Sequence, residues 1–429
     1  MRYLASQLQC RIQLAMTRTR SAFAAHVLVA TPVAFLMLPG TADAATIAAV
    51  SCSNVDVQIA VNAAVTDDVV TIPAGDCTWT TRVNVNKAIT LRGAGVGQTI
   101  LRNGTKVMLS IIIPPMGTVN VSDITFDLMS RDTGSNGAIE MFARGNNLAA
   151  FRFHHFEMLN QFERGFYIFM EGYEVGGLID HGRITSKGSK WVSIEGTGPE
   201  EHQPFTRPLE LGTNKFIFIE DNSIENISQN AQIDGWNDAY TGARYVYRFN
   251  THTGCPAEAG HHGADSGFAR GTHSFEIYNN TFAHTLSCSY HTRTIYFRSG
   301  TGVVFNNTWT GSGYDQNMEL ANYRSNESHP PWGRCDGTSP WDGNVPGKNG
   351  WPCLDQIGRV FGPTTGGTNL SEPLYEWNNT TNGKDSALYA ETLNHNTALH
   401  VKENRDFFND TVRPGYTSYT YPHPLQKQN

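Results

Sequence analysis

Short apolar runs separated by glycine, asparagine and aspartate make up most of the chain after residue 70. These runs show little of the 3.6-residue period of a helix and are rich in β-branched and aromatic residues, which predicts strands. Several recur at intervals of roughly 20 to 30 residues, the period at which stacked repeats form a solenoid. We therefore expect an all-β fold in which each coil turns one face of its strands towards a shared core. The predicted strands include residues 89–92, 119–126, 151–156, 166–169, 215–219, 245–249, 274–278 and 294–297.

Three asparagine pairs follow predicted strands at corresponding places, each with a threonine after it: Asn279-Asn280, Asn306-Asn307 and Asn378-Asn379. Asparagine tolerates left-handed backbone, and its amide can bond to the same residue one coil away, so the pairs predict stacked turns. Unrelated polar turns are the alternative explanation. An antiparallel sandwich is the competing fold, but the tight two-residue hairpin turns that such a fold uses are scarce in this chain.

The ends of a solenoid need cover, because an open coil exposes an unpaired sheet edge. Residues 55–65 predict a short amphipathic helix that caps the N-terminal end, with an apolar stripe formed by Val57, Val61, Ala64 and Val65. Residues 310–356 are rich in glycine, proline, tryptophan and asparagine, which predicts a long loop insertion. Residues 385–429 are expected to form a C-terminal cover.

The N-terminus has the pattern of a secretory signal peptide. Arg18 and Arg20 precede an apolar run at residues 22–38, and small residues follow at Ala42-Asp43-Ala44. We expect cleavage near Ala44, so that residues 1–44 are the signal peptide and residues 45–429 form a single domain that is secreted or periplasmic. A retained membrane anchor is the alternative, although Pro32 and Pro39 interrupt the run.

The formal net charge of −7 makes the chain a poor general binder of nucleic acid or anionic membranes. We therefore expect no nucleic-acid partner and no membrane contact after the signal is removed. We also expect a monomer. Attraction to an acidic ligand has to be local.

Six cysteines remain once Cys10 leaves with the signal peptide. An even number in an oxidising compartment, without a Cys-x-x-Cys pair, favours disulfides over a metal site, and reduced buried thiols are the alternative. Neighbourhood in the sequence suggests the pairs Cys52–Cys77, Cys255–Cys288 and Cys335–Cys353, one of fifteen connectivities that six cysteines allow.

Two segments resemble the opening coils of the pectate-lyase-like parallel β-helix superfamily. They are Val-Thr-Ile-Pro-Ala-Gly-Asp at residues 70–76 and Ile-Thr-Leu-Arg-Gly-Ala-Gly-Val-Gly-Gln-Thr-Ile-Leu at residues 89–101. The resemblance implies a right-handed parallel β-helix with an N-terminal capping helix and long lateral loops. It concerns the fold and does not specify the reaction.

Two further segments are similar to pectate lyases themselves. Leu-Ile-Asp-His at residues 178–181 resembles their Trp-Ile-Asp-His segment. Residues 293–300 resemble their arginine run, in which two arginines are separated by four residues and a glycine follows shortly before an Asn-Asn turn. The resemblance implies that Arg293 is the catalytic base and that Asp180 lies near a Ca²⁺ site. Ca²⁺ is therefore the expected cofactor, with Asp234 as a second candidate metal ligand. Leu178 stands where the family has tryptophan, so pectate is not assigned as the substrate.

Residues 234–298 concentrate polar groups that a structural solenoid does not need. Lyase chemistry on a uronic acid polymer removes the proton at C5 next to a carboxylate, so it needs cations and a base. Arg270, Arg293 and Arg298 are candidates for the cationic clamp, whose bidentate geometry suits a carboxylate. The predicted catalytic residues are Arg293, Arg270, His262 and Tyr247. The predicted substrate-binding residues are Arg298, Arg248, His273, Trp236, Asp238 and Asp265.

The sequence therefore favours a secreted polysaccharide lyase that cleaves a uronic-acid-containing polymer by β-elimination. A glycoside hydrolase on the same fold is one alternative and needs two carboxylates, for which Asp234, Asp238, Asp265 and Glu276 are candidates. A glycan-binding or adhesin-like solenoid without turnover is another. In that case tryptophans would stack on sugar rings, and the candidates are Trp191, Trp236, Trp309, Trp332, Trp341 and Trp351.

Overall fold

A computed structural model describes most of the chain after residue 43. The described residues are 44–133, 137–144, 148–171, 175–187, 190–196, 208–228, 232–255, 257–264, 270–286, 293–312, 316–342, 352–361 and 369–427. The predicted signal peptide, apart from Ala44, lies outside the described residues. Asp265 also lies outside them. Among the described residues, no helix is long and apolar enough to cross a membrane.

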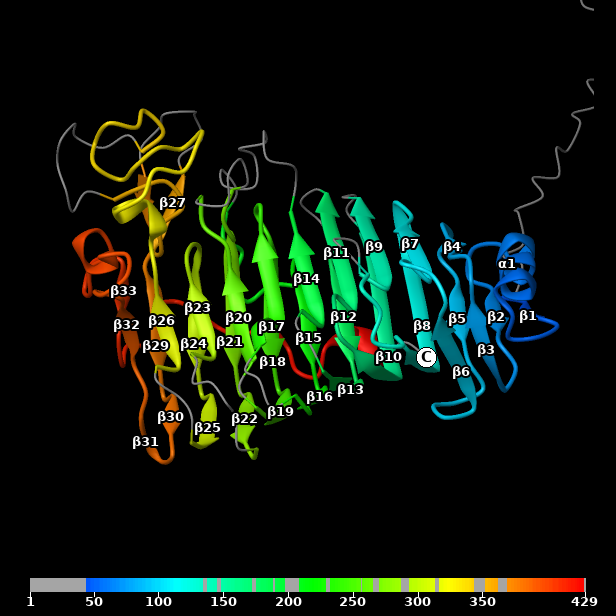
Figure 1. The fold of residues 1–429 in the computed structure, drawn as a ribbon. Helices are drawn as coiled ribbons and strands as arrows, with labels where there is room; N and C mark the ends of the chain where they lie inside the picture. The colour runs from blue at the N-terminus through cyan, green and yellow to red at the C-terminus, as the bar shows by residue number, and fades with distance from the viewer. Residues whose placement is uncertain are drawn as a thin grey trace, which may run out of the picture. The chain divides into compact units, whose positions relative to one another are not determined.

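The described strands form two large sheets (Figure 1). Sheet A contains two parallel series of strands, which share β8 and β10. Its strands are β1 (Thr46–Ala48), β2 (Val69–Thr71), β3 (Gly75–Trp79), β5 (Thr90–Arg92), β6 (Thr99–Asn103), β8 (Met116–Asp127), β10 (Leu148–Gln161), β12 (Gly177–Asp180), β13 (Arg183–Ser186), β15 (Ile217–Glu220), β16 (Ser223–Asn226), β18 (Arg244–Arg248), β19 (Thr251–Gly254), β21 (Ser274–Tyr278), β22 (Thr281–His284), β24 (Thr301–Phe305), β25 (Thr308–Gly311), β29 (Leu374–Trp377), β30 (Thr380–Thr381), β31 (Lys384–Asp385) and β33 (Phe407–Phe408).

Sheet B is a single parallel series, and its described strands follow one another in chain order. They are β4 (Val83–Val85), β7 (Leu109–Ile113), β9 (Ile139–Arg144), β11 (Phe166–Glu171), β14 (Val192–Glu195), β17 (Gln232–Tyr240), β20 (Ala257–His261), β23 (Ile295–Phe297), β26 (Met318–Leu320) and β32 (Leu388–Ala390). Each strand thus lies beside its counterpart from the next coil.

The prediction of an all-β fold with stacked strands is confirmed. Apart from β27 (Arg359–Phe361) with β28 (Asn369–Ser371), and β30 with β31, the pairings between described strands are parallel. This pattern is consistent with a solenoid and excludes the antiparallel sandwich. The eight predicted strands all occur, with ends that differ by a few residues.

The asparagine pairs form a stacked ladder, as predicted. The second asparagine of each pair is buried. The side-chain nitrogens of Asn280 and Asn307 each donate to the side-chain oxygen of the asparagine in the next coil at 3.0 Å, whereas Asn379 donates to the Val304 backbone oxygen and to Glu376 at 2.9 Å. The first asparagine has left-handed backbone, with φ between 54° and 57°. Two members that are not in asparagine pairs extend the ladder, which consists of Asn222, Asn250, Asn280, Asn307 and Asn379.

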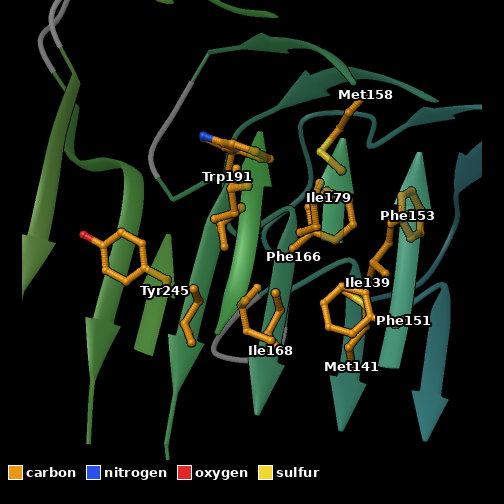
Figure 2. Close-up of a cluster of buried hydrophobic side chains, with 14 of the residues drawn as sticks. Ile139, Met141, Phe151, Phe153, Met158, Phe166, Ile168, Ile179, Trp191 and Tyr245 are labelled. Atoms are coloured by element: carbon orange, nitrogen blue, oxygen red, sulfur yellow. The ribbon is translucent and has the colours of Figure 1, made fainter. Parts of the chain in front are cut away.

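Apolar side chains of both sheets fill one continuous core. Figure 2 shows Ile139, Phe166 and Ile168 of sheet B in the same core as Phe151 and Phe153 of sheet A. Phe153 and Phe166 meet edge to face, with ring centroids 4.9 Å apart, the geometry that aromatic pairs prefer. Alternation along each strand therefore fixes which side chains enter the core and which face outwards.

The predicted capping helix is α1 (Asn54–Ala63). The Ser53 side chain accepts a hydrogen bond from the Asp56 backbone nitrogen at 3.2 Å and begins the helix, and Val57 and Val61 are buried as predicted. The prediction was wrong for Val65, which is 63% exposed. The chain becomes extended at Ala64, so Val65 no longer follows the helical period.

Two of the three predicted disulfides are confirmed, namely Cys52–Cys77 and Cys335–Cys353. Cys255 is also disulfide-bonded. Its predicted partner Cys288 lies outside the described residues, so that pairing stays a prediction. Disulfides point to an oxidising, extracellular type of compartment.

Residues 385–429 contain both sheet and cover. β32 and β33 extend the two sheets, whereas residues near the C-terminus lie over an outward-facing apolar row of sheet A that includes Leu178, Phe218 and Val246. Arg248 holds this segment by donating to the backbone oxygens of Tyr419 and Thr420 at 2.8 and 2.9 Å. Within residues 310–356, β26 joins sheet B and a 3-10 turn, η3 (Tyr323–Ser325), follows it.

Two histidines in the core predict sensitivity to acid. Burial lowers the pKa of His252 and of His261 to about 3. In the unfolded chain these imidazoles take up protons below about pH 6.5, whereas the folded protein keeps them neutral, so the free energy of unfolding falls as pH drops from 6.5 towards 3. Each histidine should lower the free energy of unfolding by about 2 kcal/mol at pH 5, relative to neutral pH. Thermal unfolding between pH 7.5 and 4.5 checks this; a midpoint that does not fall with pH would contradict it.

Candidate functional site

One row of side chains runs across the outer face of sheet B. The two positions that flank a member along its strand are buried in every case except Tyr389, for example Ile139 and Met141 around Glu140, so the row itself points outwards. Neighbouring members are about 4.8 Å apart, the spacing of paired strands. In register, the row is Asn84, Ser110, Glu140, Tyr167, Ser193, Asp238, Gly260, Tyr296, Glu319 and Tyr389.

Asp238 on β17 is the centre of the row. Its carboxylate lies 3.2 Å from Arg164 Nη2, 3.2 Å from Lys190 Nζ and 2.8 Å from His262 Nε2. Burial opposes ionisation of Asp238, but the three neighbouring basic side chains outweigh burial and hold the pKa of this carboxyl well below its usual range. Asp238 is therefore a fixed negative charge that orients the groups around it.

His262 connects Asp238 to Arg298. Arg298 Nη2 lies 2.7 Å from His262 Nδ1, and Arg298 Nε donates to the His261 backbone oxygen at 2.9 Å. Because an arginine can only donate, Nδ1 is the accepting nitrogen of the ring, and the imidazole proton is on Nε2, next to Asp238. The Asp238–His262–Arg298 chain is therefore a defined arrangement in which Nδ1 carries a lone pair.

Two tyrosines and a glutamate adjoin this chain. Tyr167 donates its hydroxyl hydrogen to Glu195, which stands opposite Tyr240 in the register of β14 and β17. The Tyr240 ring meets the His262 ring edge to face at 5.6 Å. Burial is the main cause that raises the pKa of Tyr167 and of Tyr240, with Glu195 acting in the same direction, so both phenols stay protonated at neutral pH.

Arg293 lies further along the same face. Its guanidinium pairs with Glu258 at 3.0 Å and with Glu319 at 3.3 Å, and it stacks 3.5 Å from the centre of the Tyr296 ring. Arg293 and Arg298 flank β23, so the structure brings the two arginines of the predicted run to one surface. The cluster of Arg164, Lys190, Glu195, Asp238, Tyr240, His262 and Arg298 is called the Asp238 cluster below.

Several predicted site residues lie elsewhere. Tyr247 and Trp236 are wholly buried in the core, where their ring centroids are 4.3 Å apart, so neither can contact a polymer outside. Arg248 is buried against Glu220 and the C-terminal segment on sheet A. His273 is 1% exposed and lies beside the Ser274 hydroxyl. These positions do not favour the predicted catalytic and substrate-binding roles, because all four side chains are buried.

Arg270, a predicted catalytic residue, forms a buried ion pair with Asp355. Both side chains are 0% exposed, and the two nitrogen–oxygen distances are 2.7 and 2.6 Å. This placement favours a structural role, in which Arg270 fixes the segment around Asp355, at the end of the predicted loop insertion, to the residues that precede β21.

We predict that Arg270→Met lowers the free energy of unfolding by about 3 to 5 kcal/mol, because it leaves the buried Asp355 carboxylate without its partner. Arg183→Met is the matched control. Its side chain is 75% exposed and lies 3.9 Å from Glu157, so the change should stay within about 0.5 kcal/mol. Urea unfolding measures both. Loss of activity in a fully stable Arg270→Met protein would instead restore the catalytic role.

The residues around Asp180 do not fit the expected Ca²⁺ site. Asp180 is 0% exposed and accepts two hydrogen bonds from Arg152, at 3.0 and 2.9 Å, while His181 Nδ1 lies 2.7 Å from it. Its oxygens thus face donors, whereas Ca²⁺ needs six to eight oxygen ligands. The side chain of Asp234 lies outside the described residues. No step below is derived through calcium.

The tryptophans expected for a glycan-binding surface are largely internal. Trp191, Trp236 and Trp309 are 0% exposed, and Trp332 is 3% exposed. Trp341 is half-buried against Trp332, and Trp351 lies outside the described residues. Stacking of sugar rings on a row of exposed tryptophans therefore gains no support from the described part of the chain.

Residue-by-residue reasoning missed Arg164, Tyr167, Lys190, Glu195 and Tyr240. A signal for the outward row was present, because a single polar or tyrosine residue stands between two apolar ones in several strands. Examples are Ile139-Glu140-Met141, Phe166-Tyr167-Ile168, Ile295-Tyr296-Phe297 and Met318-Glu319-Leu320. Stacking these triplets in register predicts the row.

Comparisons with protein-family models, curated proteins and solved structures found no match. The structure therefore provides the description of the protein class: an all-β protein of stacked parallel strands, with charged residues and tyrosines on the outer face of sheet B.

Proposed function

We propose that the protein is a polysaccharide lyase that cleaves a uronic-acid-containing polymer by β-elimination on the outer face of sheet B. The observation that carries the proposal is the Asp238 cluster, where a carboxylate, an imidazole, an arginine and a protonated tyrosine adjoin one another on one face. The cluster holds three permanent cations, Arg164, Lys190 and Arg298, against the carboxylates of Asp238 and Glu195. It can therefore attract an acidic sugar although the chain as a whole is acidic.

Arg298 is proposed to bind the substrate carboxylate. In the proposed mechanism the uronate carboxylate binds the Arg298 guanidinium, which suits a carboxylate in bidentate geometry. Arg298 then leaves His262 Nδ1 and neutralises the charge that builds on the carboxylate when the C5 proton is removed.

His262 is the proposed base and Tyr240 the proposed acid. The freed Nδ1 lone pair takes the C5 proton, while Asp238 next to Nε2 stabilises the imidazolium that forms. The electron pair of the C5–H bond forms the C4–C5 double bond, the C4–O4 bond breaks, and Tyr240 gives its proton to the departing O4. Proton exchange with solvent restores both residues.

The test is a panel of acidic polysaccharides, each incubated with the full protein with and without Ca²⁺. The proposal predicts new ultraviolet absorbance from the unsaturated uronate on at least one polymer. Reducing ends without this absorbance would favour a glycoside hydrolase, for which Asp238 and Glu195 on neighbouring strands are the paired carboxylates. Retention on a glycan array with neither product would favour a binding module. Both of these outcomes contradict the lyase.

We further propose that the chain is a single right-handed parallel β-helix and that it is a secreted or periplasmic monomer after signal cleavage. The recurring order of parallel pairings and the disulfides support these two statements. Sequencing the N-terminus of the exported protein tests the second, which predicts a start near Ala45.

A further inference from the structure

A column of turn residues on sheet A differs from the rest of the asparagine-rich turns. The strands that lead into these turns pair in register, so the turn residues lie one coil apart. In later coils the corresponding positions hold Asn279, Asn306 and Asn378. In four earlier coils they hold Asp123, His155, His181 and Asp221, all with left-handed backbone at φ of 62°, 48°, 53° and 58°. Two imidazoles thus lie between two carboxylates.

His154 and His155 bring two ligand atoms together. Their Nδ1 atoms are 2.8 Å apart and share a hydrogen bond, so a bound metal ion would take the place of the shared proton. Two nitrogens bound at right angles to one metal ion, each at about 2.0 Å, are separated by about 2.8 Å, whereas a tetrahedral angle requires about 3.3 Å. The spacing therefore suits two adjacent ligands of a square-planar or octahedral ion.

The neighbours of His155 hold its ring in place. The His181 ring stacks on it with centroids 4.8 Å apart and planes 4° apart. His181 is fixed in turn because its Nδ1 lies 2.7 Å from Asp180, and Asp180 is held by the two hydrogen bonds from Arg152. The imidazole at position 155 is therefore oriented before any ligand arrives, which lowers the entropic cost of binding.

An anion and an open approach complete the arrangement. Ser122 donates its hydroxyl hydrogen to Asp123 Oδ2 at 2.7 Å, which orients this carboxylate at the hollow that His154 and His155 also line. These residues line an open hollow together with Thr90, Arg92 and Asn120. His155 is exposed, so an ion and its remaining water ligands can reach the pair.

We propose that His154 and His155 bind one divalent transition-metal ion of the copper(II) class through their Nδ1 atoms, with Asp123 as the neighbouring anion. Imidazole nitrogen in square-planar geometry favours copper(II) or nickel(II), whereas calcium and magnesium prefer oxygen ligands. The site lies on sheet A, apart from the Asp238 cluster, and does not depend on the lyase proposal.

The test titrates the chelator-treated full chain with copper(II) sulfate, followed by calorimetry and electron paramagnetic resonance. Three variants are compared. His155→Asn keeps the left-handed backbone, because asparagine occupies that conformation in the later coils. His154→Gln lies on the strand and keeps its register. His181→Asn is the matched control, since it removes an imidazole from the same column but leaves the Nδ1 pair intact.

The expected result is one copper ion per chain with two coordinated imidazole nitrogens. His154→Gln and His155→Asn should each weaken copper binding at least tenfold and remove one nitrogen from the spectrum, whereas His181→Asn should retain both nitrogens. The proposal is overturned if the first two variants bind copper as the wild type does, or if His181→Asn loses as much affinity as they do. Circular dichroism confirms that each variant is folded.

Discussion

Replacing His262 by glutamine should lower kcat by about 10² to 10⁴, the range that a positioned general base contributes. Glutamine can still reach towards Asp238, but it cannot take the C5 proton. Binding of an uncleaved uronate oligosaccharide should change little, because Arg298 remains. The measurement is the initial rate of ultraviolet absorbance on the best polymer of the panel, together with the dissociation constant of the oligosaccharide.

Tyr389→Phe is the matched control for His262→Gln. Tyr389 belongs to the same outward row, but it lies on β32, and three strands separate it from β17. Its activity should match the wild type. If His262→Gln retains activity within tenfold of the wild type while remaining folded, His262 is not the base.

A change in the asparagine ladder should destabilise the protein as much as Arg270→Met does. Asn280→Ala removes three hydrogen bonds that its side-chain nitrogen donates, to the backbone oxygens of Tyr247 and Tyr278 at 2.9 and 3.1 Å and to Asn307 at 3.0 Å. It also removes the oxygen that accepts from the Asn250 backbone nitrogen, and one of the three oxygens that accept from the Asn250 side-chain nitrogen. Because all these groups are buried, we expect a loss of about 3 to 5 kcal/mol in the free energy of unfolding.

The neighbouring residue provides a control for this variant. Asn279 has a φ of 57°, and glycine adopts this conformation without strain. Asn279→Gly should therefore change the free energy of unfolding by less than about 1 kcal/mol. Denaturant unfolding of both variants separates the ladder from the turn. Equal losses would mean that the stacked amides add nothing beyond the turn itself.

The stacked-strand fold could be predicted because its signals are local and repeated. Strand runs such as residues 274–278 and the Asn-Asn turns recur once per coil, and each repetition of a pattern supports the others. The capping helix could also be predicted from a local signal, because the spacing of Val57 and Val61 marks the buried face of a helix. The end of that helix was missed at Val65, where one change of backbone conformation at Ala64 breaks the period.

The candidate site was harder to predict, because a cluster of charged residues in the sequence does not show which way each side chain points. Arg248 and Arg298 look alike in the chain, yet one is buried at 0% exposure and the other lies on the outer face of sheet B. A shift of one position along a strand moves a side chain to the opposite face. Arg164 and Asp238 are far apart in sequence, and only the parallel register of sheet B brings them together.

Buried ion pairs are a further reason why the predicted site residues could not be identified reliably from the sequence. Arg270 was predicted to bind the carboxylate of a substrate. In the structure it binds a carboxylate of the same chain, that of Asp355. The sequence contains both residues without any pattern that links them. Buried pairs of this kind depend on where a long loop returns, which local periodicity does not encode.

The most direct test of the central claim is a crystal structure of the His262→Gln variant with a bound uronate oligosaccharide. We expect the oligosaccharide across β14, β17, β20 and β23 of sheet B, with one carboxylate on Arg298 and the glycosidic oxygen near the Tyr240 hydroxyl. An oligosaccharide bound on sheet A or at either end of the stacked strands, with the Asp238 cluster unchanged from the free protein, would contradict the claim.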